Sequence, residues 1–170
     1  MKIKLLTRNI LLLAALLLFS TSKSLAQYNG TFGMGAHLNY ATEIARPGIG
    51  LDIHYYLTNN FRIAPSLTYY MSVKNKSMWN IDGDVHYVVP IGTQFSFYPL
   101  LGLHFSEWKN MKELSEPSDK NIYNKRLGLN AGLGFQYDLS YKTRATFEVK
   151  YQSIKDYSQV AFMLGVGFWL

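Results

Sequence analysis

Apolar and polar or small residues alternate one by one along most of this chain, most clearly over its last eleven residues. One side of that segment carries Val160, Phe162, Leu164, Val166, Phe168 and Leu170, and the other carries Ala161, Met163, Gly165, Gly167 and Trp169. A period of two predicts a β-strand. Because only one face is strongly apolar and the other holds mostly small residues, we expect the apolar face to meet lipid rather than a soluble core.

Seven further segments show the same alternation. The predicted strands are Thr31–Tyr40, Gly48–Leu57, Phe61–Met71, Trp79–Val89, Gln94–Phe105, Arg126–Leu139, Arg144–Gln152 and Gln159–Leu170. An even number of short, alternating strands is typical of a single-chain membrane barrel. The sequence therefore predicts an all-β protein, an eight-stranded antiparallel up-and-down transmembrane β-barrel. A soluble β-sandwich with core aromatics is the alternative.

The connections between these strands alternate in length. Short turns are predicted at Thr58–Asn60, Pro90–Thr93 and Ser140–Thr143, and longer connections at Ala41–Pro47, Ser72–Met78, Ser106–Lys125 and Ser153–Ser158. In membrane barrels the short turns face the periplasm and the long loops face outside. Pro65 and Pro99 fall inside predicted strands and count against this register, since proline cannot donate to a ladder, unless each lies at a β-bulge. We keep both segments as strands.

The N-terminus is predicted to be a secretory signal peptide. Lys2, Lys4 and Arg8 precede an apolar run from Ile10 to Phe19, and Ser24-Leu25-Ala26 offers small residues before Gln27. The apolar run is about half the ~20 residues that a spanning helix needs. We expect residues 1–26 to be cleaved after Ala26, leaving one barrel domain, 27–170, exported to the outer membrane.

Charge and cysteine content narrow the function classes. The chain has 17 basic and 11 acidic residues, but four of the basic residues lie in the signal segment, so residues 27–170 carry a net charge of only +2. The strongly basic charge that would have supported nucleic-acid binding is therefore absent from residues 27–170. With no cysteine there is neither a disulfide nor a lipid-anchor thiol, and closure of the barrel is expected to provide stability instead.

Polar and small residues occupy the faces that would point into the barrel, including all four histidines. Isolated charges there would be costly, so we expect acids and bases to pair with one another and with trapped water as a structural network. That network is predicted to contain Asp52, His54, Arg62, Asp82, Asp84, His86, His104, Arg144, Glu148 and Lys150. An eight-stranded barrel is just wide enough to be filled by side chains, so the lumen is expected to be plugged.

Two motifs in that network offer a sharper hypothesis. Asp52-Ile53-His54 and Asp84-Val85-His86 each place a carboxylate and an imidazole on one strand face. Zinc or copper would need three or four such ligands to converge. Because the strand carrying Arg62 separates the two motifs, we favour ion pairing and expect no metal and no cofactor.

Taken in order, several segments resemble the small outer-membrane β-barrel superfamily of Gram-negative bacteria, the OmpA/OmpX-type and "porin family" barrels. They are Phe97–Leu103, Leu129–Tyr137, Phe147–Tyr151 and the alternating C-terminal strand. The resemblance implies a role in envelope scaffolding, adhesion or resistance to host defence, without shared catalytic residues. It also implies that the barrel-assembly machinery binds the C-terminal strand. That strand usually ends in an aromatic residue, whereas this chain ends in Leu170.

Some barrels of this size modify lipid A, so an enzyme remains the less favoured alternative. His104-Phe105-Ser106 is a faint match to a His-x-Ser pair in which the imidazole activates the hydroxyl. His104, however, is predicted to face inward, with Ser106 at the edge of a loop and Glu107 next to it. We therefore predict that the protein is not an enzyme.

The sequence predicts an interaction or structural protein without a continuous open pore, in contact with lipid and lipopolysaccharide. The longest predicted connection, Ser106–Lys125, mixes acidic, basic and aromatic residues and could bind an extracellular or envelope protein. A monomer is expected. The main alternative is a narrow passive diffusion channel, which would need connected water-filled space beside the inward glycines.

Overall fold

The computed structural model describes residues 29–73, 76–110, 122–154 and 157–170. The predicted signal segment 1–26 and the cleavage after Ala26 lie outside the described residues. No helix within these ranges is both long enough and apolar enough to cross a membrane.

The described residues form nine strands. They are β1 (Phe32–Ala41), β2 (Arg46–Tyr56), β3 (Phe61–Val73), β4 (Lys76–Tyr87), β5 (Val89–Pro90), β6 (Phe95–Asn110), β7 (Ile122–Asp138), β8 (Thr143–Ile154) and β9 (Tyr157–Trp169). The short β5 continues β4, because both pair with β6 in one register, His86 with Leu100 and Val89 with Phe97. The nine strands therefore make eight barrel strands, as predicted.

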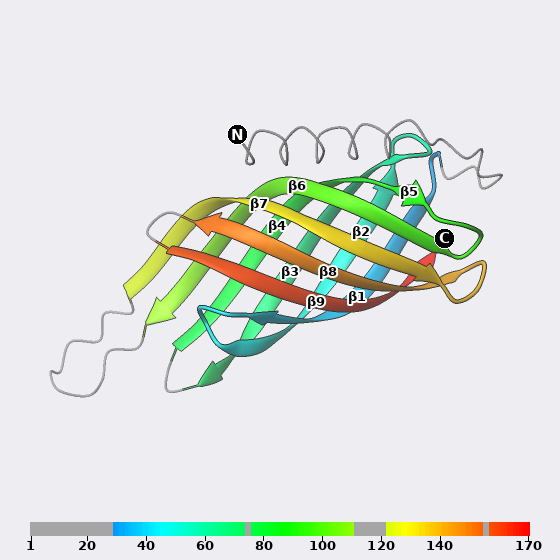
Figure 1. Cartoon of the computed structure of the whole chain (residues 1–170). Helices are drawn as coiled ribbons and strands as arrows, with labels where there is room; N and C mark the ends of the chain where they lie inside the picture. The colour runs from blue at the N-terminus through cyan, green and yellow to red at the C-terminus, as the bar shows by residue number, and fades with distance from the viewer. Residues whose placement is uncertain (1–28, 74–75, 111–121, 155–156) are drawn as a thin grey trace, which may run out of the picture.

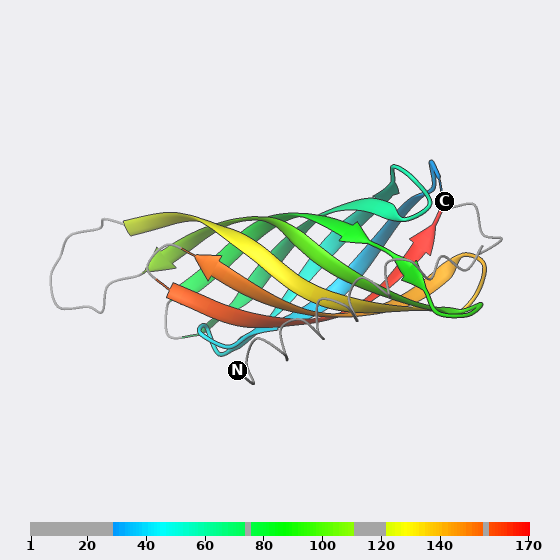
Figure 2. The same cartoon turned by 45° about the horizontal axis from the view of Figure 1, so that its top comes forward.

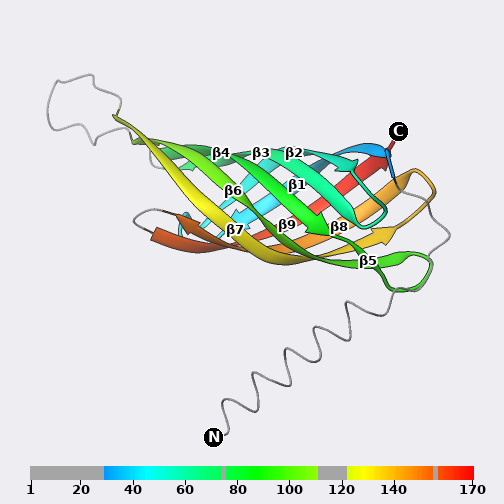
Figure 3. The same cartoon turned by 90° about the horizontal axis from the view of Figure 1, so that it is seen from above.

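With β4 and β5 taken as one barrel strand, every strand pairs antiparallel with its neighbours in the chain, and β1 pairs with β9 to close the barrel. The closed wall and its two ends are visible in Figure 1. Two further views show the strands running obliquely to the long axis (Figures 2 and 3), as closure of a barrel requires. Closure leaves no unpaired strand at the seam between the first and last strands, so backbone groups can be satisfied in an apolar environment.

The two ends of the barrel differ. The turn end holds the four-residue connections 57–60, 91–94 and 139–142 together with Leu170. At the loop end, residues 42–45 join β1 to β2, and three further strand pairs end beside connections that lie outside the described residues, which are 74–75, 111–121 and 155–156. The predicted short turns are confirmed, but three of the predicted long connections are short, because their flanking residues extend the strands up to the pairs Ala41–Arg46, Val73–Lys76 and Ile154–Tyr157.

The strands β6 and β7 also extend beyond their predicted ends, at Phe105 and Arg126. Pairing continues from Ser106–Arg126 to Asn110–Ile122, and both strands project past β8 at the loop end (Figures 1 and 3). The mixed charges of this stretch favoured a loop, but the two strands satisfy each other's backbone groups whatever their side chains. The predicted loop Ser106–Lys125 is therefore strand at both ends, and residues 111–121 lie outside the described residues.

Beside each of Pro65 and Pro99, two successive residue pairs are missing from one ladder, and the register does not shift. On either side of Pro65, β2 pairs with β3 in one register, at Asp52–Ser66 and Tyr55–Ile63. The break between β4 and β5 lies opposite Pro99, again with no shift. Neither proline therefore lies at a bulge, and both predicted segments are strands. Both rings point outward and are exposed, so the missing N–H weakens the ladder only locally.

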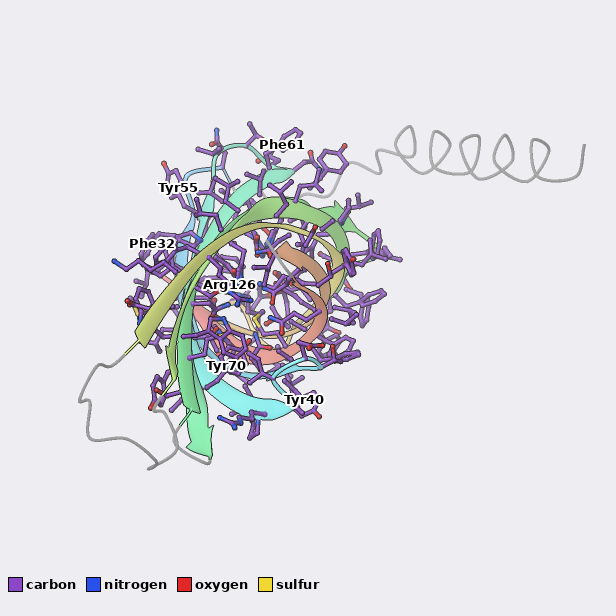
Figure 4. All side chains as sticks on the ribbon, turned by 90° about the vertical axis from the view of Figure 1, so that its left-hand side faces the viewer. Phe32, Tyr40, Tyr55, Phe61, Tyr70 and Arg126 are labelled. Atoms are coloured by element: carbon purple, nitrogen blue, oxygen red, sulfur yellow. The ribbon has the colours of Figure 1, made fainter. Side chains whose placement is uncertain are left out.

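Outward residues form an apolar belt around the barrel. Leu51, Leu101 and Leu127 are each at least 65 % exposed. Figure 4 shows Phe32, Tyr40, Tyr55 and Phe61 on the outside of the ring, whereas Tyr70 and Arg126 lie on its inner side. An exposed apolar belt with aromatics towards its edges is the surface expected of a barrel that sits in a bilayer.

Candidate functional site: the polar barrel interior

The barrel interior is the main concentration of polar chemistry in the described part of the chain. All ten residues of the predicted network are buried, and none is more than 6 % exposed. They come from β2, β3, β4, β6 and β8, and each occupies an inward position of its strand. The strand period thus places every one of them inside the wall.

Lys150 is the centre of an acidic cluster in the interior. Its Nζ donates to Asp84 Oδ2 at 3.0 Å and to Asp82 Oδ2 at 3.2 Å, and lies 3.9 Å from Glu148 Oε2. Asp82 Oδ1 is also 2.6 Å from His104 Nδ1. One ammonium group therefore bridges two carboxylates of β4 and one of its own strand, β8.

A second cluster surrounds Asp52. Arg144 Nη2 lies 3.5 Å from Asp52 Oδ2, while His37 Nδ1 is 3.3 Å from Oδ1 and His54 Nε2 is 3.4 Å from Oδ2. The other ring nitrogen of His37 is 3.0 Å from the hydroxyl of Thr68. Asp52 is therefore surrounded by a guanidinium and two imidazoles, from its own strand and from two others, β1 and β8.

Arg62 does not bridge to a carboxylate, which corrects the expectation that it would form an ion pair. Its guanidinium donates to His86 Nδ1 at 2.8 Å and to Gln136 Oε1 at 2.6 Å. It also lies over the ring of Tyr98, 4.7 Å from the centroid, a favourable cation–π contact. Because guanidinium can only donate, His86 must accept at Nδ1 and carry its proton on Nε2.

The two Asp-x-His motifs do not assemble into a metal centre. Asp84 contacts Lys150 and accepts from Asn130, and His86 is engaged by Arg62. Within residues 29–73, 76–110, 122–154 and 157–170, no three metal-ligating side chains come together in a way that could hold an ion.

The His-x-Ser segment also lies in the wall of the lumen. His104 is fully buried against Asp82. Ser106 is fully buried as well, inside β6 and paired with Asn80 and Arg126, which corrects its placement at the edge of a loop. Glu107 follows on the opposite face of the strand. Neither His104 nor Ser106 is therefore presented to lipid.

Apolar clusters lie inside the barrel towards both ends, and the sequence did not predict them. At the turn end, buried Tyr56, Val88, Tyr98, Leu100 and Trp169 pack together. At the loop end, Ala41, Tyr70, Met78 and Ala161 pack together, with Ile44 and Trp108 against them. The available signal was the inward position of these large residues near strand ends. Tyr98 also faces an inward glycine, Gly134.

One cavity between the polar side chains is small. A cavity of about 10 Å³ lies among Asp52, His54, His86, Glu148 and Lys150, which is room for about one water molecule. His54 Nδ1 and His86 Nε2, two of the nitrogens on its lining residues, have no protein partner.

A closed barrel of eight antiparallel strands, with an apolar outside and a polar inside, defines the class of small membrane β-barrels. Residues 11–168 match the family described as the outer membrane protein beta-barrel domain. The chain belongs to this family, and it is an outer-membrane barrel. A comparison with curated proteins finds no match.

Solved structures show the same fold. The N-terminal β-barrel domain of Pseudomonas aeruginosa OprF is 21 % identical, with a TM-score of 0.67 over 85 % of this chain and 100 % of that domain. Neisserial surface protein A is 15 % identical, with a TM-score of 0.64 over 82 % and 97 %. Ail, the attachment invasion locus protein of Yersinia pestis, is 16 % identical, with a TM-score of 0.58 over 84 % and 99 %.

Proposed function

We propose that this protein is a monomeric, non-enzymatic barrel of the outer membrane with a plugged lumen, and that it acts in envelope structure, adhesion or interaction through its loop end. The observation that carries the proposal is the filled interior, in which the polar network lies between two apolar clusters. A barrel that admits no solute can act only through its two ends and its lipid-facing surface. The role of the network is then to hold the wall in a single shape.

The inward glycines support the plugged lumen over a passive channel. A Cβ at any of the ten would lie within 3.0 Å of another heavy atom, and at nine of them a neighbouring side chain is among the closest atoms. The ten positions are Gly33, Gly35, Gly48, Gly50, Gly102, Gly128, Gly132, Gly134, Gly165 and Gly167. The space beside them is occupied, so they do not line the connected path that conduction would need.

The loop end carries most of the positive charge. With the short turns in the periplasm, the loop end faces outside. Nine of the thirteen basic residues after residue 26 lie in or beside its four connections, with six acidic residues. Lysines bind anionic oxygens as point charges, which suits the phosphates of lipopolysaccharide. Ail has been solved in complex with the heparin analogue sucrose octasulfate, and we propose that this loop end also binds polyanions.

Replacing four loop-end lysines should weaken polyanion binding. The full-length mature protein is titrated with sucrose octasulfate by calorimetry, beside a variant with Lys109, Lys112, Lys120 and Lys125 all changed to Gln. Four charge contacts of about 0.2–1 kcal/mol each predict binding weaker by about fourfold or more, and raised salt should weaken binding by the wild type.

The matched control is Lys142→Gln, which removes one exposed lysine from the turn end and should leave binding unchanged. Heat-modifiable migration on a gel verifies that each variant is folded. Equal binding by the wild type and the quadruple variant would contradict the proposed polyanion site.

A further inference from the structure

The lipid-facing surface contains a groove of about 540 Å³ where β9, β1, β2 and β3 lie side by side. Its walls are exposed aliphatic side chains, which are Leu38, Ile49, Leu51, Leu67, Leu164 and Val166. All six point outward from the middle of their strands. The groove therefore belongs to the apolar belt and not to the lumen.

The groove exists because a small residue stands in a row of large ones. Ala36 is paired with Leu51 on one side and with Val166 on the other. In the next row of outward residues all three side chains are large, with Leu38 between Ile49 and Leu164. Two inward glycines, Gly50 and Gly165, flank the neighbouring residue His37 and also line the groove.

The lining offers nothing to a polar ligand at its centre. His37 reaches the groove from the inward side of β1, but both of its ring nitrogens are engaged inside the barrel, by Asp52 and Thr68. At one edge, towards the loop end, stands Tyr69, which is 48 % exposed. The groove is thus apolar at its centre and has the phenol ring of Tyr69 at its edge nearest the loop end.

We propose that this groove binds one acyl chain of a phosphorylated glycolipid of the lipid A type in the outer leaflet. The groove is continuous with the surface that already meets lipid, and an unfilled concavity would forfeit dispersion contacts along its walls. A flexible acyl chain can fill it without leaving a polar group unsatisfied. The excess of basic residues at the loop end complements the phosphates of such a lipid.

A second copy of this chain fits the groove poorly. A two-fold symmetric dimer centred here would set groove against groove, because the same patch meets itself. Two concavities cannot fill each other. The assignment of the outer leaflet rests on the orientation given under the proposed function, but it is independent of whether the lumen conducts.

Filling the groove should displace the bound lipid. The mature wild-type protein and the Ala36→Phe variant are each reconstituted in vesicles of lipid A and phosphatidylethanolamine and then extracted in mild detergent. Native mass spectrometry measures which lipid each protein retains. The wild type should retain one lipid A that Ala36→Phe retains at least about tenfold less often, because losing the contacts of two or more CH₂ groups weakens binding by that factor.

The matched control is Ala131→Phe. Ala131 is also an outward alanine in mid-strand, between Leu101 and Tyr151 on β6 and β8, but it does not line the groove. Lipid retention by this variant should equal that of the wild type. Equal retention by all three proteins would overturn the proposal, as would retention of phosphatidylethanolamine in place of lipid A. A wild-type dimer that Ala36→Phe separates would assign the groove to a second copy and also overturn it.

Discussion

Replacing Lys150 by Met is expected to destabilise the barrel by about 3–5 kcal/mol, the cost of breaking a buried ion pair from one side. Lys150 Nζ lies within 4 Å of carboxylate oxygens of Asp82, Asp84 and Glu148. Methionine has a similar length but no charge, so the three carboxylates would lose their shared cation. The measurement is a denaturant titration of the protein folded in lipid vesicles, followed by heat-modifiable migration on a gel.

Two further variants make that result specific. Lys142→Met removes an exposed lysine at the turn end and should change the free energy of unfolding by no more than about 0.5 kcal/mol. Combining Lys150→Met with Asp82→Asn and Asp84→Asn removes much of the uncompensated charge and should recover part of the loss. A Lys150→Met barrel as stable as the wild type would show that the cluster is not closed to water.

Gly134→Leu is expected to cost about 3 kcal/mol or more, through overpacking and a lost hydrogen bond to a charged group. A Cβ at Gly134 would collide with the ring of Tyr98. That ring stacks on His86 at 4.7 Å between centroids, and its hydroxyl donates to Glu148 at 2.8 Å. Displacing one side chain therefore disturbs both the turn-end apolar cluster and the polar network.

The double variant Gly134→Leu with Tyr98→Ala tests this cause. Removing the ring makes room for the leucine, so the double variant should lose less stability than the sum of the two single variants. Gly83→Ala is the control, because Gly83 points outward and a Cβ there meets nothing within 4 Å. Strict additivity of the two single changes would contradict the packing account.

The strands and the two faces of the wall could be predicted from the sequence because alternation is a local property. The inward positions of Asp52, His54 and the other network residues follow from the same period. When an apolar residue of a strand points outward, the residues before and after it point inward. The number of strands, the antiparallel order and the inward position of all four histidines needed no information beyond this pattern.

The partners of those residues could not be predicted, because they depend on which strands face each other across the lumen. Arg62 meets Gln136, 74 positions away, and Lys150 meets Asp82, 68 positions away. Charge alone favoured an acidic partner for Arg62, whereas the lumen gives it an imidazole, an amide and an aromatic ring.

The strand ends were also beyond local reasoning. Ser106 to Asn110 resembles a loop by composition, yet it pairs with Ile122 to Arg126 at every position. Strand pairing depends on backbone groups. Outside the membrane the outward side chains no longer need to be apolar, so the alternation that predicts a strand disappears there. The two prolines behave similarly, since their effect on the ladder depends on the neighbouring strand and not on the proline alone.

The measurement that tests the central claim most directly is the conductance of the refolded mature protein in a planar bilayer, after heat-modifiable migration has shown that the barrel is closed. A lumen filled by the Lys150 and Asp52 clusters and capped at both ends predicts no conductance above the lipid background. Steady, reproducible single-channel steps would contradict that account and would assign the protein to passive diffusion.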